Sequence, residues 1–265
     1  MDGVCYLRHQ PGRFLRLPNR FYRVRIVGID NFALDSNTFN QPLPLEATPA
    51  GEQRRERLTA PTDGVELDQE QLDWLREGLV ASWATPEVRG RILVLHHPPS
   101  VTEASKWDQG QTLAVRHQLR PVLDQVAARV GSPARGRPLV DLGISGQAHC
   151  LESIETADTG HGDAWMPWLI CAGRGNSLRR QRPEGPSLGE CGEMGVRTIA
   201  RSQLFVGRSG RGSRLRRPYS GLRVECGRRP PTAPAPHPLV AEKVEGTWRP
   251  YDLETIRVAE YRSGG

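Results

Sequence analysis

Two histidines stand at the ends of separate apolar segments, where their imidazoles could act together. His96 follows the run ILVL in ILVLHHPPS, and His149 closes the turn in ISGQAHCL, two residues after Gln147. Imidazole is the commonest metal-binding side chain in proteins, whereas a carboxamide oxygen is a weaker donor to transition metals and zinc. The pattern leaves two alternatives open: a shared metal site, or two structural histidines satisfied within the fold.

The segments around these residues have the patterns of alternating helices and strands. From Asp68, a plausible N-cap, leucines recur on one face of an amphipathic helix, and LAVRHQLRPVLDQVAARV at 113–130 predicts a second helix. Short apolar strands end at HHPP, SGQAH and AGRGN. This alternation favours a layered α/β fold, in which ligands bind at the carboxyl ends of the strands. We therefore expect His96 and His149 to face one crevice.

The composition is that of a globular protein with a basic, arginine-rich surface. The chain has 265 residues, 37% of them hydrophobic, and a formal net charge of +6. No apolar run reaches the ~18 residues of a membrane span, and the first residues lack the apolar core of a secretory signal, so a cytoplasmic location is expected. The five cysteines form no C-x-x-C pair, which is typical of reduced, buried thiols.

The ordered motifs resemble the C-terminal half of the calcineurin-like metallophosphoesterases. Q-x-x-W-L lies on the first helix, followed by H-H-P-P, S-G-x-x-H-C-x-E and an apolar strand that enters a Gly-rich turn; FALDSN after an earlier strand is similar to a stretch that these enzymes carry between their halves. The resemblance covers roughly residues 18–182. It implies half of a four-layer α/β/β/α sandwich and hydrolysis of a phosphate ester at two metal ions, Mn, Fe or Zn.

The resemblance also implies which residues bind metal. His96 takes the place of the family's His before Pro, and His149 takes that of the last histidine of G-H-x-H, while Gln147 stands where the first histidine of that block belongs. Blocks of the form D-x-H, G-D-x-x-D and G-N-H are absent from the sequence. Two imidazoles and a carboxamide fall short of the three or four ligands of a stable zinc site. We therefore expect His96, His149 and, marginally, Gln147 to bind a divalent metal weakly, with little activity from this chain alone.

The ends of the chain fit this interpretation in two ways. Residues 1–17 are expected to be a linker remnant after a lost N-terminal half, or to follow a start site placed too late. Residues 183–265 are expected to form a β-rich, arginine-rich extension. A chain that lacks half of its sandwich would expose a sheet edge and an apolar surface, and a third hypothesis is an inactive fragment that associates with a partner in order to fold.

Nucleic-acid binding is the competing functional class. Fourteen arginines lie between Arg174 and Arg229, and arginine binds phosphate bidentately. Only Phe205 and Tyr219 are interleaved as aromatics for base stacking. The same stretch is also typical of a solvated basic face, so a phosphate-ester substrate, RNA and solvent all remain as partners of these arginines.

Three polar residues near the predicted site have their own expected roles. His97 is adjacent to His96 on a strand end and should point to the opposite side, which favours packing or hydrogen bonding over ligand contact. Glu152 and Asp108 are expected to lie on the solvated surface.

Overall fold

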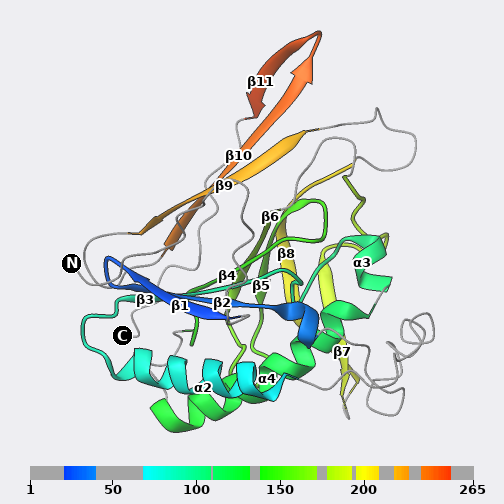
Figure 1. The fold of residues 1–265 in the computed structure, drawn as a ribbon. Coiled ribbons are helices and arrows are strands. Elements are labelled where there is room, and N and C mark those ends of the chain that lie inside the picture. The colour runs from blue at the N-terminus through cyan, green and yellow to red at the C-terminus, as the bar shows by residue number, and fades with distance from the viewer. Residues whose placement is uncertain are drawn as a thin grey trace, which may run out of the picture.

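The computed structural model of the chain describes residues 21–39, 68–108, 110–131, 138–171, 178–192, 195–208, 218–226 and 234–251. It is a strand-rich mixed α/β structure with one large sheet, one small sheet and few helices (Figure 1). The expected linker remnant at 1–17 lies outside the described residues.

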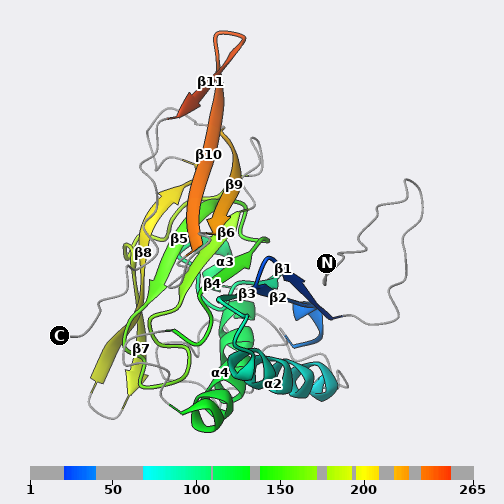
Figure 2. The same cartoon turned by 90° about the vertical axis from the view of Figure 1, so that its left-hand side faces the viewer.

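Two long helices lie side by side against one face of the large sheet (Figures 1 and 2). The first, α2 (Gln69–Ala84), begins where the Asp68 carboxylate accepts the backbone N–H of Gln71, a side-chain cap. The second, α4 (Gln111–Val130), lies between two glycines with positive φ, Gly110 at 73° and Gly131 at 71°. A short helix, α3 (Ala104–Asp108), and a 3-10 turn, η1 (Ser36–Thr38), follow strand ends.

The large sheet has eight strands in the order β1-β2-β3-β4-β6-β5-β8-β7. The four strands β2, β3, β4 and β6 are parallel, and the others pair antiparallel. Its strands are β1 (Tyr22–Ile26), β2 (Ile29–Leu34), β3 (Gly90–Leu95), β4 (Leu142–Ser145), β5 (Leu151–Thr156), β6 (Pro167–Cys171), β7 (Ser187–Gly192) and β8 (Gly195–Val206).

A three-stranded antiparallel sheet stands on the other face and projects from the body (Figures 1 and 2). It consists of β9 (Tyr219–Cys226), β10 (Pro234–Val244) and β11 (Thr247–Tyr251). Leu222 and Val224 of β9 pack on an apolar cluster of the large sheet that includes Leu142 and Leu169. The described residues thus form a helix layer, a large sheet and a three-stranded sheet on its other face.

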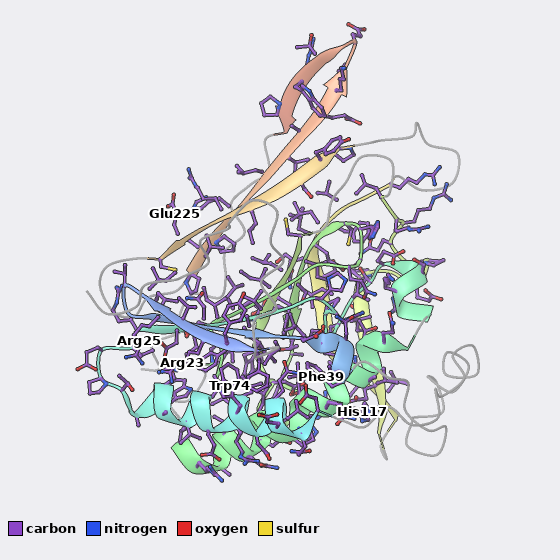
Figure 3. The ribbon with its side chains drawn as sticks, viewed as in Figure 1. Arg23, Arg25, Phe39, Trp74, His117 and Glu225 are labelled. Carbon is purple, nitrogen blue, oxygen red and sulfur yellow. The ribbon has the colours of Figure 1, made fainter. Side chains whose placement is uncertain are left out.

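The main core lies between the large sheet and the helices. Leu72, Leu75 and Leu79 of α2 are buried there, as the sequence predicts. Trp168 of β6 is the largest fully buried side chain and lies opposite Gly143 of β4 in the strand register. At the sheet edge, Arg23 and Arg25 of β1, labelled in Figure 3, form ion pairs with the buried Asp30.

The predicted mixed α/β class is confirmed, whereas the division of the chain into domains stays a prediction. Residues 183–265, expected as a single extension, are shared between the sheets: β7 and β8 pair within the large sheet, and β9 to β11 form the small one. Within the described ranges, no helix is long and apolar enough to span a bilayer.

Candidate functional site

His96 and His149 come together at the carboxyl edge of the parallel strands. Strands β3 and β4 are neighbours with Leu95 opposite Ser145, so the residues that follow them leave the sheet at the same edge. The Gly146 N–H donates to the His96 carbonyl oxygen at 3.1 Å, and a Cβ at Gly146 would lie 3.5 Å from His96 Nδ1. Burial lowers the pKa of His96, and the nearby Lys106 and His149 lower it further.

The turn that carries Gln147 and His149 has an unusual backbone. Both residues have positive φ, 56° for Gln147 and 51° for His149, a left-handed conformation that non-glycine residues adopt rarely and at a cost of roughly 1–3 kcal/mol. The Arg179 N–H donates to the His149 carbonyl oxygen at 3.2 Å and ties the turn to the segment after β6. Such strained residues cluster at ligand sites, and here the two strained residues are the two predicted ligands that follow β4.

Gln147 and His149 differ in the contacts of their side chains. The Gln147 amide donates to Gln111 Oε1 at the start of α4, at 3.1 Å. The Nδ1 atom of His149 is buried and has no hydrogen-bond partner among the described residues. An orphaned imidazole nitrogen fits a role as a metal ligand, because a buried polar atom without a partner is costly.

The donor set is nevertheless short of a complete metal site. In the described part of the chain, no group of three His, Cys, Asp or Glu side chains could hold a metal ion. His96, His149 and Gln147 therefore fit a metal in part, as three donors of which one is a carboxamide. Their role as ligands stays a prediction, and no hydrolytic step follows from these residues alone.

His97 has the structural role that its neighbouring position predicts. Its ring is 3% exposed, Nδ1 lies 2.9 Å from the Ser36 hydroxyl, and its backbone N–H donates to the same hydroxyl at 2.8 Å. Burial, aided by His96, lowers the pKa of His97 to about 4. His97 is therefore neutral at physiological pH and holds the 3-10 turn η1 against the end of β3.

Glu152 is buried, and the expectation of a solvated surface position was wrong. It lies on β5 and accepts hydrogen bonds from the backbone N–H and the hydroxyl of Thr102. Burial raises the pKa of Glu152 to about 7, and hydrogen bonds from Thr102 and Ser202 act in the opposite direction. Glu152 thereby anchors the segment after His96 to the sheet. Asp108 is the last residue of α3, and its side chain lies outside the described residues.

Lys106 and Arg179 are charged residues of this edge that the sequence pattern did not single out. Three loops, which follow β3, β4 and β6, are joined by main-chain bonds: Ala104 N–H to Arg180 O at 2.9 Å, Arg182 N–H to Thr102 O at 2.8 Å, and the Arg179 bond to His149. The sequence offered one signal for Lys106, namely that lysine is rare in this chain and occurs only twice.

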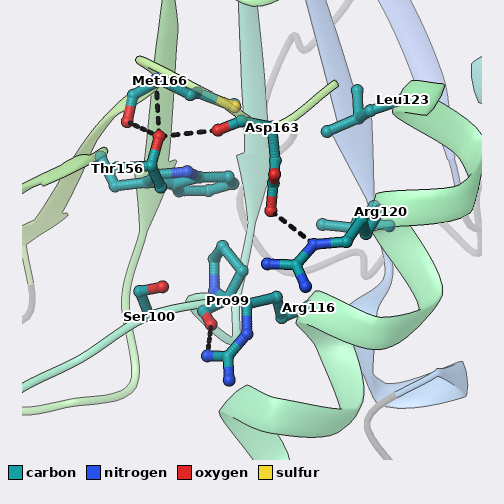
Figure 4. A pocket seen from close by; sticks show the side chains of 10 residues that line it. Pro99, Ser100, Arg116, Arg120, Leu123, Thr156, Asp163 and Met166 are labelled. Carbon is teal, nitrogen blue, oxygen red and sulfur yellow. Dashed lines mark hydrogen bonds and ion pairs between the residues drawn. The ribbon is translucent and has the colours of Figure 1, made fainter. Parts of the chain in front are cut away.

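A second cluster of charges lines a small cavity between α4 and the sheet (Figure 4). Arg120 donates to Asp163 at 3.0 Å and to Glu190 at 3.0 Å, and Arg116 donates to the Pro99 carbonyl oxygen. Carboxylates balance the guanidinium groups, and the cavity of about 10 Å³ has room for one water molecule. This arrangement is a packed ion-pair network that fixes α4, and it leaves no space for a substrate.

Comparisons with known proteins give only distant likenesses. No protein-family model matches the chain, and no curated protein sequence matches it. Solved structures that are similar to it include the following two. "GAP50 the anchor in the inner membrane complex of Plasmodium" has a TM-score of 0.43 and 16% identity over 91% of this chain and 56% of that one. "Structure of PhoD" has a TM-score of 0.44 and 13% identity over 94% and 48%. The chain spans about half the length of each, and likeness at this level carries no functional assignment.

Proposed function

We propose that this chain carries half of the active site of a metal-dependent phosphoesterase-type hydrolase, with His96 and His149 as metal ligands and Gln147 as a weak third. The observation that supports it most is that His96 and His149 follow two adjacent parallel strands at one sheet edge, where Gly146 of the His149 turn lies against His96. The orphaned Nδ1 of His149 and the strained turn around it add to this support. With three donors or fewer, metal binding is weak and hydrolysis by this chain alone is slight or absent.

A metal titration of the purified chain tests this proposal. Mn²⁺ and Zn²⁺ are expected to bind with low affinity at one site, and His149→Ala should weaken binding by at least about tenfold because it removes one of two imidazole ligands. Isothermal calorimetry gives the affinity and stoichiometry. The matched control is His161→Ala, because His161 lies on a different turn, where its ring pairs with Asp124 of α4. Equal affinity in wild type and His149→Ala would rule out this ligand set.

Binding of single-stranded nucleic acid is the second candidate function, and one observation favours it. Tyr219 of β9 and Trp248 of β11 are 49% and 52% exposed, and their rings meet edge to face with centroids 5.2 Å apart. Lys243 on β10 is directly opposite Trp248 in the strand register. Exposed aromatic rings beside a cation can stack on bases and contact the phosphate backbone.

The two candidates separate in a binding assay with single-stranded RNA. Trp248→Ala is expected to weaken RNA binding by about fivefold or more, because stacking contributes roughly 1–3 kcal/mol per base. Fluorescence anisotropy at two salt concentrations measures it, with His149→Ala as the variant that should bind RNA normally. Affinity that is the same in Trp248→Ala as in wild type would exclude this sheet as the RNA site.

A further inference from the structure

The small sheet has one face that packs on the molecule and one that faces outward. Side chains alternate between the two faces of a strand, and along β10 the burial alternates in the same way. The buried residues of β10 are Pro234, Pro236, Pro238 and Val240. Leu222 and Val224 of β9 are opposite two of these residues and pack on the large sheet. The odd-numbered residues of β9 and β10 therefore form the outer face.

Large apolar side chains lie exposed on this outer face. Leu239 is 56% exposed in the middle of β10, and Tyr219 and Trp248 are each about half exposed on the flanking strands. Tyr219 is opposite Ala241, which shares the face of Leu239. Trp248 is opposite Lys243 on the same face, and its ring meets that of Tyr219 edge to face. An apolar patch of this kind, on a sheet that projects from the body (Figure 2), is typical of an interaction site.

The size of the outer face suits a weak interface between two protein chains. Between the rows of Ala235 and Lys243, β10 rises about 27 Å, and the three strands together are roughly 14 Å wide. Two such faces packed together would bury on the order of 1,000 Å² in total, which is at the lower end for specific interfaces. We therefore expect a partner that binds reversibly.

The charges at the two ends of this face are complementary to those of a second copy of the chain. Lys243 lies at one end, next to the turn between β10 and β11. Glu225, labelled in Figure 3, lies at the other end of the same face. It pairs with Arg223 at 2.9 Å and with His237 at 3.3 Å, and a carboxylate has sites for further donors. Leu239 is midway between the row of Lys243 and that of Glu225. A two-fold axis that crosses the strands at Leu239 would therefore bring Lys243 of each copy to the Glu225 end of the other.

We propose that the outer face of the small sheet is the contact surface of a homodimer, in which two copies stack face to face with their strands antiparallel. Leu239 of each copy then meets Leu239 of the other at the two-fold axis, and Tyr219 lies over Arg223 of the second copy, as a cation–π pair. Lys243 faces Glu225 of the second copy. With the strands parallel, Lys243 would instead face Lys243, which like charges disfavour. This inference does not depend on the proposed metal site.

Sedimentation velocity of the whole chain, from about 1 to 200 µM, tests the inference. A monomer–dimer equilibrium with a Kd on the order of micromolar is expected for an interface of this size. Leu239→Arg places two guanidinium groups at the axis and should raise the Kd at least about tenfold. The matched control is Val196→Arg, because Val196 is a 75% exposed aliphatic residue of β8 in the other sheet. A chain that stays monomeric throughout, or a dimer that Leu239→Arg leaves intact, overturns the inference.

Charge reversal tests the antiparallel arrangement. Lys243→Glu and Glu225→Lys, made singly, should each raise the Kd about fivefold or more, because each brings like charges together across the interface. The double variant restores an opposite-charge pair and should dimerise with a Kd within about threefold of wild type. A double variant that dimerises as weakly as the single variants contradicts the proposed stacking.

The same protein separates other occupants of this face. A monomer that binds single-stranded RNA, and loses that binding in Trp248→Ala, identifies RNA as the ligand of the face and overturns the homodimer. A monomer that co-sediments with phosphatidylcholine–phosphatidylserine vesicles, and no longer does so in Leu239→Arg, identifies a membrane surface and also overturns it. The metal titration of the proposed function is read separately, since His149 belongs to the large sheet's edge.

Discussion

Trp168→Ala is expected to lower the free energy of unfolding by roughly 3–5 kcal/mol. The indole is 2% exposed and belongs to the main core between the large sheet and the helices. Its removal forfeits the transfer free energy of a large aromatic side chain and leaves a cavity. Urea denaturation followed by circular dichroism measures the loss. Trp248→Ala, at a 52% exposed tryptophan, is the matched control and should change stability by less than about 1 kcal/mol.

Gly143, which lies opposite Trp168 on β4, provides a second test of this packing. A Cβ on Gly143 would fall closer than 3.0 Å to the Trp168 ring, so Gly143→Ala alone should cost roughly 1–3 kcal/mol through overpacking. In the Trp168→Ala background the added methyl enters the cavity, and the double variant should lose less than the sum of the two single losses. Strict additivity would contradict the close packing of β4 on β6.

Local elements were predictable because their signals are local. The N-cap predicted at Asp68 is the N-cap of α2, and the leucines predicted to share one face are buried. The apolar run before HHPP ends at Leu95, as β3 does. The second helix begins at Gln111, two residues earlier than predicted, because Gly110 turns the chain in a left-handed conformation directly before it. The convergence of His96 and His149 followed from strand order, since neighbouring parallel strands end at one edge.

Features that depend on pairing between distant segments were not predictable. Strand β5 follows β4 in the chain but lies beyond β6, and β8 pairs with it from some 50 residues away. Glu152 was misassigned for a related reason: Thr102, from the segment after β3, contacts its carboxylate on β5, and no local pattern indicates that contact. The loops that carry Lys106 and Arg179 are likewise joined by a bond between distant segments, from Ala104 N–H to Arg180 O.

Glu152→Gln is expected to change how stability depends on pH. The folded-state pKa of Glu152 is about 7, above the usual value of 4.5, chiefly because burial disfavours the carboxylate. Between these two pH values the folded chain binds more protons at this residue than the unfolded chain does. The contribution of Glu152 to stability is therefore full below pH 4.5 and falls as the pH rises toward 7, by about 3 kcal/mol in total.

Glutamine keeps the shape of the neutral acid and a carbonyl oxygen that can accept the Thr102 N–H, but it does not titrate. Relative to wild type, Glu152→Gln should therefore gain about 3 kcal/mol between pH 4 and pH 8, whatever its offset at pH 4. Urea denaturation at pH 4, 6 and 8 gives the difference, and the titration of His97 cancels because both proteins contain it. Glu155→Gln is the control on the same strand, where the pKa is raised less by partial burial. A constant difference between Glu152→Gln and wild type at all three pH values would mean that Glu152 does not titrate as a buried acid. The segment from His96 to Thr102 would then be held by the Thr102 bonds to an ordinary carboxylate, and its anchoring would not weaken as the pH approaches 7.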